Sequence, residues 1–204
     1  MTARTTPATE DFSTVLHLIR AAVTAGIDLV QIREKNLSAN VLYELSASAA
    51  RITSGSTTRL LVNDRADIAA AAGADGVHLT TQSLPADVVR HTFGDDFVIG
   101  VSTHSAEEAS IARRGGADFV VFGPVFETAS KIEYGAPQGL TKLEKVSLEV
   151  SPFPVLALGG LTISNVADCL QVGAQGIAAI RMFGDPEKLG DVVYAIRESV
   201  RREP

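Results

Sequence analysis

A short phrase recurs four times along the chain, and this repetition constrains the fold more than any other feature. Each copy has a glycine, a small or apolar residue, an acid or amide, and then a run of β-forming residues. The copies are GIDLVQI (26–32), GADGVHL (73–79), GADFVVF (116–122) and GAQGIAA (173–179). A glycine in this position is typical of a helix end, followed by a tight turn into a buried parallel strand. The repeat therefore predicts a chain of successive helix, turn and strand units.

Three further apolar runs lie between these copies, and stretches with helical periodicity alternate with the runs. The runs are RLLVND (59–64), FVIGVS (97–102) and FPVLALGG (153–160). Apolar residues spaced by three or four positions, together with cap residues, predict helices at 12–25, 38–52, 65–72, 85–93, 105–115, 163–172 and 186–200. Strict alternation of strand and helix indicates a parallel sheet with helices outside it.

The number of predicted strands favours a barrel over an open sheet. Seven strand candidates in 204 residues come close to the eight strands of a compact (β/α)8 barrel. A doubly wound open sheet is the rival, but the first strand-to-helix turn has no GxGxxG motif. We therefore predict one (β/α)8 TIM barrel domain over residues 1–204. Residues 1–11 (MTARTTPATED) carry no apolar run, so the first strand is weak or missing.

Composition argues against several classes of partner. The formal net charge is -6 and only 5% of residues are aromatic, which argues against nucleic-acid binding. The single cysteine, Cys169, excludes an internal disulfide and a multi-cysteine metal cluster, and it suits a reducing compartment. Because no long apolar segment is present, we expect neither a signal peptide nor a membrane span, and we expect a cytoplasmic protein.

Polar side chains gather at the carboxyl ends of the predicted strands, where the sites of such barrels form. These residues are Gln31, Arg33, Glu34, Lys35, Asn63, Asp64, Arg65, His78, Ser102, Thr103, His104, Lys131 and Arg181, and one further strand ends in Gly159-Gly160. Arginine and lysine give charge-assisted hydrogen bonds to phosphate oxygens. Gly159-Gly160, ahead of a helix starting near Ser164, can present backbone N–H groups to an anion. The set predicts an anionic substrate with more than one phosphate group.

Each of these features has a simpler interpretation when it is taken alone. QIREK (31–35) can be a strand end with solvated charges, and Asn63-Asp64 can cap the next helix. His78, inside a strand, fits a core histidine, and an isolated lysine such as Lys131 is usually solvated. The site interpretation is favoured because most strand ends carry such groups.

Seven motifs in one order resemble the thiamine phosphate synthase family and its close relative, the TenI-type thiazole tautomerases. They are QIREK (31–35), VNDRADIA (62–69), GADGVHL (73–79), GVSTHS (100–105), FGPVFETASK (122–131), APQGL (136–140) and ALGGLT (157–162). The resemblance covers roughly residues 12–200 and implies a (β/α)8 barrel. It also implies an enzyme of thiamine biosynthesis that couples a hydroxymethylpyrimidine diphosphate to a thiazole phosphate and releases pyrophosphate.

The resemblance implies roles for individual residues. The positions that match groups holding the pyrimidine diphosphate are Gln31, Arg33, Lys35, Asn63, Ser102 and Lys131. Those that match the thiazole phosphate pocket are Thr128, Ser130, Gly160, Ile180 and Arg181, and His78 matches a histidine beside the pyrimidine. Arg33, Lys35 and Lys131 are expected to carry catalysis by positioning the substrate and neutralising the departing charge.

Three departures from the family pattern leave alternatives open. The synthases hold Mg²⁺ with two aspartates; Asp64 matches the first, but Ser83 stands where the second belongs, so we expect weakened Mg²⁺ binding. Arg181 stands where the synthases usually carry a serine. FET (126–128) is typical of the tautomerases, yet Pro124 replaces their catalytic histidine. The leading hypothesis is a synthase that acts on small phosphorylated substrates. The alternatives are a metal-independent thiazole phosphate tautomerase and a non-catalytic thiazole or thiamine phosphate binder.

Overall fold

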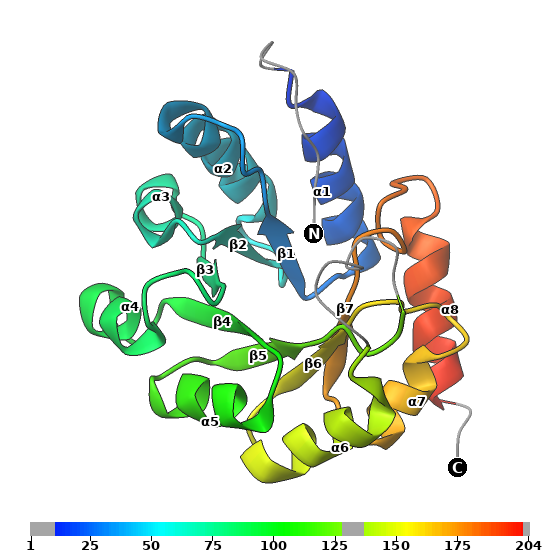
Figure 1. Cartoon of the computed structure of the whole chain (residues 1–204). Helices are drawn as coiled ribbons and strands as arrows, with labels where there is room; N and C mark the ends of the chain where they lie inside the picture. The colour runs from blue at the N-terminus through cyan, green and yellow to red at the C-terminus, as the bar shows by residue number, and fades with distance from the viewer. Residues whose placement is uncertain (1–10, 128–136, 202–204) are drawn as a thin grey trace. The chain divides into compact units, whose positions relative to one another are not determined.

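A computed structural model of the protein describes residues 11–127 and 137–201, in which strands and helices alternate (Figure 1). The strands are β1 (Leu29–Ile32), β2 (Arg59–Asn63), β3 (Gly76–Leu79), β4 (Val98–Thr103), β5 (Phe119–Phe122), β6 (Val155–Leu158) and β7 (Gly176–Ala178). The helices are α1 (Ser13–Ala25), α2 (Ala39–Thr53), α3 (Ala66–Ala72), α4 (Ala86–Phe93), α5 (Ala106–Arg114), α6 (Gly139–Val150), α7 (Val166–Gln171) and α8 (Leu189–Arg201). All seven predicted strands are present.

The strands are parallel and follow one another in chain order from β1 to β7 within one sheet. Parallel strands in chain order with a helix in each connection are the topology of the (β/α)8 TIM barrel, so the predicted fold class is confirmed. The described part of the chain holds seven strands, and the predicted weak first strand would fall almost entirely on residues 1–10, outside it.

The described residues form two compact units. The first unit comprises residues up to His78 together with Asp95–Val98 and Ile180–Ala195. The second unit comprises Leu79–Gly94, Ile99–Ala179 and the residues from Ile196 onward. A single domain over residues 1–204 stays a prediction.

The repeated phrase has the same structural role at each copy. Its glycines, at positions 26, 73, 116 and 173, have φ angles of 70°, 71°, 81° and 97°, which favour glycine at these helix ends. The third residue of three copies accepts a hydrogen bond from a backbone N–H near the start of the preceding strand. The pairs are Asp75 with Leu60 (2.8 Å), Asp118 with Ile99 (2.6 Å) and Gln175 with Val155 (2.7 Å). In these three copies the acid or amide side chain therefore ties the turn to the sheet.

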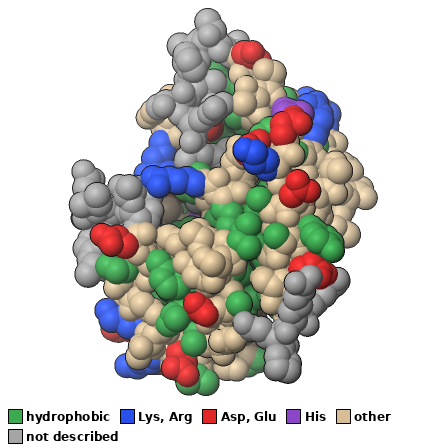
Figure 2. Space-filling model, turned by 90° about the vertical axis from the view of Figure 1, so that its right-hand side faces the viewer, with side chains coloured by type: hydrophobic (Ala, Val, Ile, Leu, Met, Phe, Trp, Pro, Cys, Tyr) green, Lys and Arg blue, Asp and Glu red, His purple; other side chains and the backbone are tan. Residues whose placement is uncertain are grey.

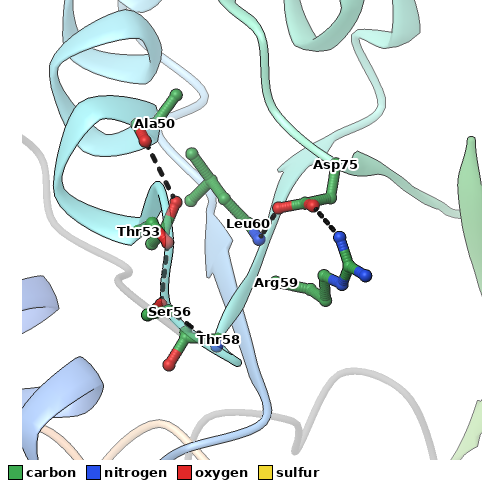
Figure 3. A network of polar contacts seen from close by, with 7 residues as sticks. All are labelled: Ala50, Thr53, Ser56, Thr58, Arg59, Leu60 and Asp75. Atoms are coloured by element: carbon green, nitrogen blue, oxygen red, sulfur yellow. Dashed lines mark hydrogen bonds and ion pairs between the residues drawn. The ribbon is translucent and has the colours of Figure 1, made fainter.

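Further polar contacts surround the start of β2 in the first unit (Figure 3). The carboxylate of Asp75 bridges the backbone N–H of Leu60 and the guanidinium of Arg59, the latter at 2.7 Å. The Thr58 hydroxyl donates to the carbonyl of Ile27 at 2.7 Å. These contacts lie at the amino ends of the strands, where polar networks stabilise a barrel rather than serve its chemistry.

One helix, α6, is absent from the sequence-based prediction. Leu143, Val146 and Val150 are buried on it at spacings of three and four residues. The segment therefore carries the same periodic signal as the predicted helices. None of the described helices is both long enough and apolar enough to cross a membrane.

Candidate functional site

Two amide side chains meet at the carboxyl ends of β1 and β2 in the first unit. Gln31 is 9% exposed, and Asn63 is the last residue of β2. Nε2 of Gln31 donates to Oδ1 of Asn63 over 3.0 Å. This hydrogen bond orients the Asn63 amide. Its Oδ1 faces Gln31, and its Nδ2 group therefore faces away from Gln31. The structure thus brings two of the predicted diphosphate-binding residues into direct contact.

The charged residues after β1 differ strongly in burial. Arg33 is half-buried and Lys35 is exposed, whereas Glu34 between them is only 6% exposed. This alternation distinguishes the two cations from the carboxylate, because successive side chains of an extended segment point to opposite sides. The simple interpretation of QIREK as a fully solvated strand end does not hold for Glu34. A cation pair that includes one solvent-exposed lysine can meet an incoming anion.

Asp64 occupies a left-handed turn directly after β2. Its φ is 65°, its N–H donates to the carbonyl of His78 at 2.9 Å, and the N–H of Arg65 donates to the carbonyl of Asn63 at 2.8 Å. Aspartate tolerates this backbone conformation better than most residues, but at some energetic cost, and such residues cluster at functional sites. Arg65 itself pairs with Asp67, Nε to Oδ1 at 2.8 Å, at the start of α3. It therefore belongs to the helix terminus.

His78 is buried within β3 and is 6% exposed. Burial, and to a lesser extent the positive charge of Arg33, lowers the pKa of His78 to about 4. The imidazole is therefore neutral at neutral pH. Its electrostatic coupling to Arg33 places these two predicted site residues within range of one another.

In the second unit, Ser83 closes a turn after β3. Its Oγ accepts the backbone N–H of Thr80 at 2.7 Å and lies 3.1 Å from the Thr80 hydroxyl. The backbone N–H of Ser83 donates to the carbonyl of Thr80 at 3.1 Å. Because aspartate makes the same type of turn contact through its carboxylate, this position can accept an acid without a change of backbone.

Ser102 lies near the carboxyl end of β4 and is half-buried. It stands opposite Val121 in the register with β5. The next polar residues, Thr103 and His104, differ in burial, since Thr103 is 1% exposed and His104 is half-buried. Ser102 thus keeps the strand-end position that the sequence predicts.

Gly159 and Gly160 follow β6 with φ angles of 102° and 63°. A Cβ on Gly159 would lie 2.6 Å from the Cβ of Pro124, and one on Gly160 would lie 2.5 Å from the carbonyl oxygen of Glu127. Both backbone angle and space therefore require glycine. Neither glycine N–H donates a hydrogen bond to another residue in the described ranges.

The helix after these glycines differs from the prediction. α7 begins at Val166 rather than near Ser164 and has six residues, so it is too short to supply an anion site at its N-terminus. Asn165 turns back instead, and its Nδ2 donates to the carbonyl of Gly160 at 3.2 Å.

The remaining predicted residues lie apart from these contacts or outside the described ranges. Ile180 is half-buried and Arg181 is exposed after β7. Thr128, Ser130 and Lys131 lie outside residues 11–127 and 137–201. Cys169 is fully buried on α7, where burial raises the pKa of its thiol to about 11, so it is a packing residue.

The described residues offer no preformed cluster of metal-binding side chains. In the described part of the chain, no group of three or more histidine, cysteine, aspartate or glutamate side chains could hold an ion. Mg²⁺ is commonly bound through one or two carboxylates together with waters and substrate phosphates. Asp64 alone therefore fits a cation that is shared with a bound diphosphate, and the described residues do not fit a cage made by protein alone.

On the face drawn in Figure 2, charged side chains of both signs are mixed rather than segregated. Figure 2 shows lysine and arginine side chains interspersed with aspartate, glutamate and apolar side chains over one face of the molecule. This pattern agrees with the overall balance of 18 basic and 24 acidic residues.

Comparison with known proteins gives consistent matches. The sequence matches the family described as "Thiamine monophosphate synthase" over residues 5–183. A putative thiamine-phosphate synthase of Geobacter sulfurreducens is 44% identical over 174 residues, which are 85% of this chain and 81% of that protein. A thiamine-phosphate synthase of Roseiflexus castenholzii is 37% identical over 174 residues, 85% of this chain and 76% of that protein.

A solved structure agrees with these sequence matches. The thiamine phosphate pyrophosphorylase of Pyrococcus furiosus superposes with a TM-score of 0.80 at 30% sequence identity. The superposition covers 91% of this chain and 89% of the other.

Proposed function

The chain belongs to the thiamine monophosphate synthase family, and on this premise we propose that it joins a hydroxymethylpyrimidine diphosphate to a thiazole phosphate and releases pyrophosphate. It is a transferase of thiamine biosynthesis. The observation that carries the proposal is the Gln31–Asn63 amide pair, which lies beside Arg33, Lys35 and Asp64 in the chain. Amide donors next to cations suit a substrate with several phosphate oxygens.

The pyrimidine diphosphate is assigned to the strand ends of β1 and β2. Gln31 orients Asn63, and the Nδ2 group of Asn63 donates to a phosphate oxygen. Arg33 and Lys35 supply positive charge for the diphosphate. Ser102 and Lys131 keep the roles that the resemblance implies, and His78 packs as a neutral imidazole beside the pyrimidine.

The thiazole phosphate is assigned to the glycine turn after β6. Neither N–H group of Gly159-Gly160 donates to another described residue, so both remain as donors for an anion at this turn. The resemblance implies that Thr128, Ser130, Ile180 and Arg181 also belong to the thiazole phosphate pocket. Arg181 is exposed, and a guanidinium gives charge-assisted hydrogen bonds to phosphate.

The chemistry requires positioning and charge neutralisation. The bond between the pyrimidine methylene carbon and the diphosphate oxygen breaks, and the diphosphate leaves with the electron pair. The thiazole nitrogen then forms a bond to that carbon with its lone pair. Arg33, Lys35 and Lys131 neutralise the charge that develops on the leaving group, and no covalent nucleophile is needed.

Asp64 would hold Mg²⁺ together with the substrate phosphates, and the ion would supply further neutralisation of the leaving diphosphate. The other contributions to catalysis, positioning of the substrates and neutralisation by Arg33, Lys35 and Lys131, come from the protein itself. A cytoplasmic location is part of the proposal and rests on the single, buried cysteine.

The test is an incubation of purified protein with both phosphorylated precursors, with and without Mg²⁺, followed by chromatography for thiamine phosphate. We expect product only when both precursors are present, and more of it with Mg²⁺. A parallel incubation with the non-aromatic thiazole carboxylate phosphate, without metal, follows the absorbance change of aromatisation. Aromatisation without coupling would replace the synthase with the tautomerase. Binding of thiazole phosphate in calorimetry without either reaction would indicate a non-catalytic binder.

A further inference from the structure

His104 is held at two points in the second unit. Its Nδ1 lies 2.6 Å from the carbonyl oxygen of Gly123, and because a carbonyl only accepts, Nδ1 carries the hydrogen and donates it. The backbone N–H of His104 donates to Oε2 of Glu108, also at 2.6 Å. The ring orientation is therefore set from both the side chain and the main chain.

Glu108 is itself fixed by the start of α5. The backbone N–H of Glu108 donates to the hydroxyl of Ser105, the N-cap residue, at 3.1 Å. An N-cap serine with a glutamate three residues later that reaches back to the chain before the helix has the form of a capping box. The backbone of His104 is thus held at the start of α5, and its ring holds the carbonyl of Gly123 by a hydrogen bond.

Gly123 begins the segment that packs on the glycine turn. A Cβ on Gly123 would lie 2.2 Å from the carbonyl oxygen of Leu158, so this backbone is in close contact with the end of β6. Two residues further on, Val125 donates to the carbonyl of Leu158 at 2.8 Å, and Phe126 donates to that of Gly159 at 3.0 Å. The location of segment 123–126 therefore determines the location of Gly159.

We propose that His104 is a positioning residue of the thiazole phosphate site. Its Nδ1–H holds the carbonyl of Gly123, which sets segment 123–126 against Gly159-Gly160 and fixes the two glycine amides for the phosphate. The inference rests on the proposed function, since it deepens the role of this turn. His104 contacts no reacting atom, and its effect is on binding of the thiazole phosphate.

Two substitutions separate the ring nitrogens. In His104→Asn, the amide nitrogen takes the place of Nδ1 and can still donate to Gly123. In His104→Gln, the amide nitrogen takes the place of Nε2, and the donor to Gly123 is lost. His91→Gln on α4 is the matched control, because His91 is exposed and lies in the same unit.

We expect His104→Gln to raise the KM for thiazole phosphate about tenfold, the effect of losing one hydrogen bond, with the KM for the pyrimidine diphosphate unchanged. The KM of His104→Asn for thiazole phosphate should stay within about threefold of the parent value, and the KM of His91→Gln should equal the parent value. Equal effects of the two His104 substitutions, or equal shifts in both KM values, would overturn the proposal.

Calorimetric titration with thiazole phosphate keeps this test separate from the proposed function. If the parent protein couples no substrates, the proposed function fails, while a weaker affinity in His104→Gln than in His104→Asn still supports the positioning role. Should His104→Gln not fold, Glu108→Ala removes the acceptor of the His104 N–H instead. An unchanged thiazole phosphate affinity in Glu108→Ala would then contradict the proposal.

Discussion

Nε2 of Gln31 donates a hydrogen bond to Oδ1 of Asn63, 3.0 Å away, so that two neighbouring parallel strands are joined by side chains at their carboxyl ends. This contact orders the two amides before any substrate arrives. Because phosphate oxygens accept hydrogen bonds, the Nδ2 donors of Asn63 are the groups that can meet a phosphate. The pair is therefore a preorganised donor, and preorganisation lowers the entropic cost of binding.

Replacing Asn63 by aspartate should impair use of the pyrimidine diphosphate. The carboxylate keeps an acceptor for Gln31 but loses the Nδ2 donors and adds a negative charge toward the diphosphate. We expect kcat/KM for this substrate to fall about 100-fold, close to the loss of a charge-assisted hydrogen bond. Asn40→Asp on α2 makes the same charge change at an exposed position, and steady-state kinetics should show it close to the parent. Similar losses in both variants would point to net charge rather than to the site.

Restoring a carboxylate at Ser83 should strengthen the response to Mg²⁺. Since the Ser83 hydroxyl already accepts the Thr80 N–H, an aspartate can keep that contact with one oxygen and present the other to the ion. In a titration of turnover against Mg²⁺, Ser83→Asp should lower the half-saturating concentration about tenfold, as expected for an added hard oxygen ligand. Ser83→Asn has nearly the same shape without the charge. If Ser83→Asn lowers the half-saturating Mg²⁺ concentration as much as Ser83→Asp does, the carboxylate is not the cause of the stronger Mg²⁺ response.

Stability should fall in mild acid because of His78. The pKa of this group lies near 4 in the folded protein and at 6.5 in the reference state, so between these values the unfolded chain binds a proton that the folded chain does not. The unfolded state is therefore favoured as pH falls through this window, by about 2 kcal/mol between pH 7 and pH 5. Urea unfolding at both pH values measures the loss, and His78→Gln should reduce it. A loss of the same size in that variant would assign the effect to other groups.

Gly160 should tolerate alanine less well than another glycine of similar backbone angle. Gly55 has a φ of 77° and open space where a Cβ would lie, whereas Gly160 has a φ of 63° and would meet backbone and side-chain atoms of residues 126 and 127. We expect Gly55→Ala to cost about 1 kcal/mol of unfolding free energy, from backbone strain alone. Gly160→Ala should cost about 3 kcal/mol, because steric overlap is added. Equal costs in chemical denaturation would contradict the close packing at Gly160.

Much of the strand order can be predicted from the sequence because every strand is a short apolar run, and four of the seven follow a glycine that ends a helix. The helix α6 was missed although its apolar spacing is regular, and α7 is shorter than predicted because Asn165 folds back to Gly160. Such a local side-chain contact has no periodic signal. It competes with helix formation and decides where the helix starts.

The candidate site was predictable at the level of residue types but not of contacts. The strand-end position of Gln31 and Asn63 follows from the alternation, yet their hydrogen bond depends on the strand register. The left-handed backbone of Asp64 and the burial of Glu34 likewise depend on packing between segments distant in sequence. The roles of Thr128, Ser130 and Lys131 stay predictions.

The most direct test of the central claim is the stoichiometry of the coupling reaction. Purified protein is mixed with the pyrimidine diphosphate, the thiazole phosphate and Mg²⁺, and thiamine phosphate and pyrophosphate are both quantified over time. We predict that the two products appear in equal amounts, and that neither appears when one substrate is omitted. Thiamine phosphate at no more than the rate without protein, even at high protein concentration, would contradict this prediction.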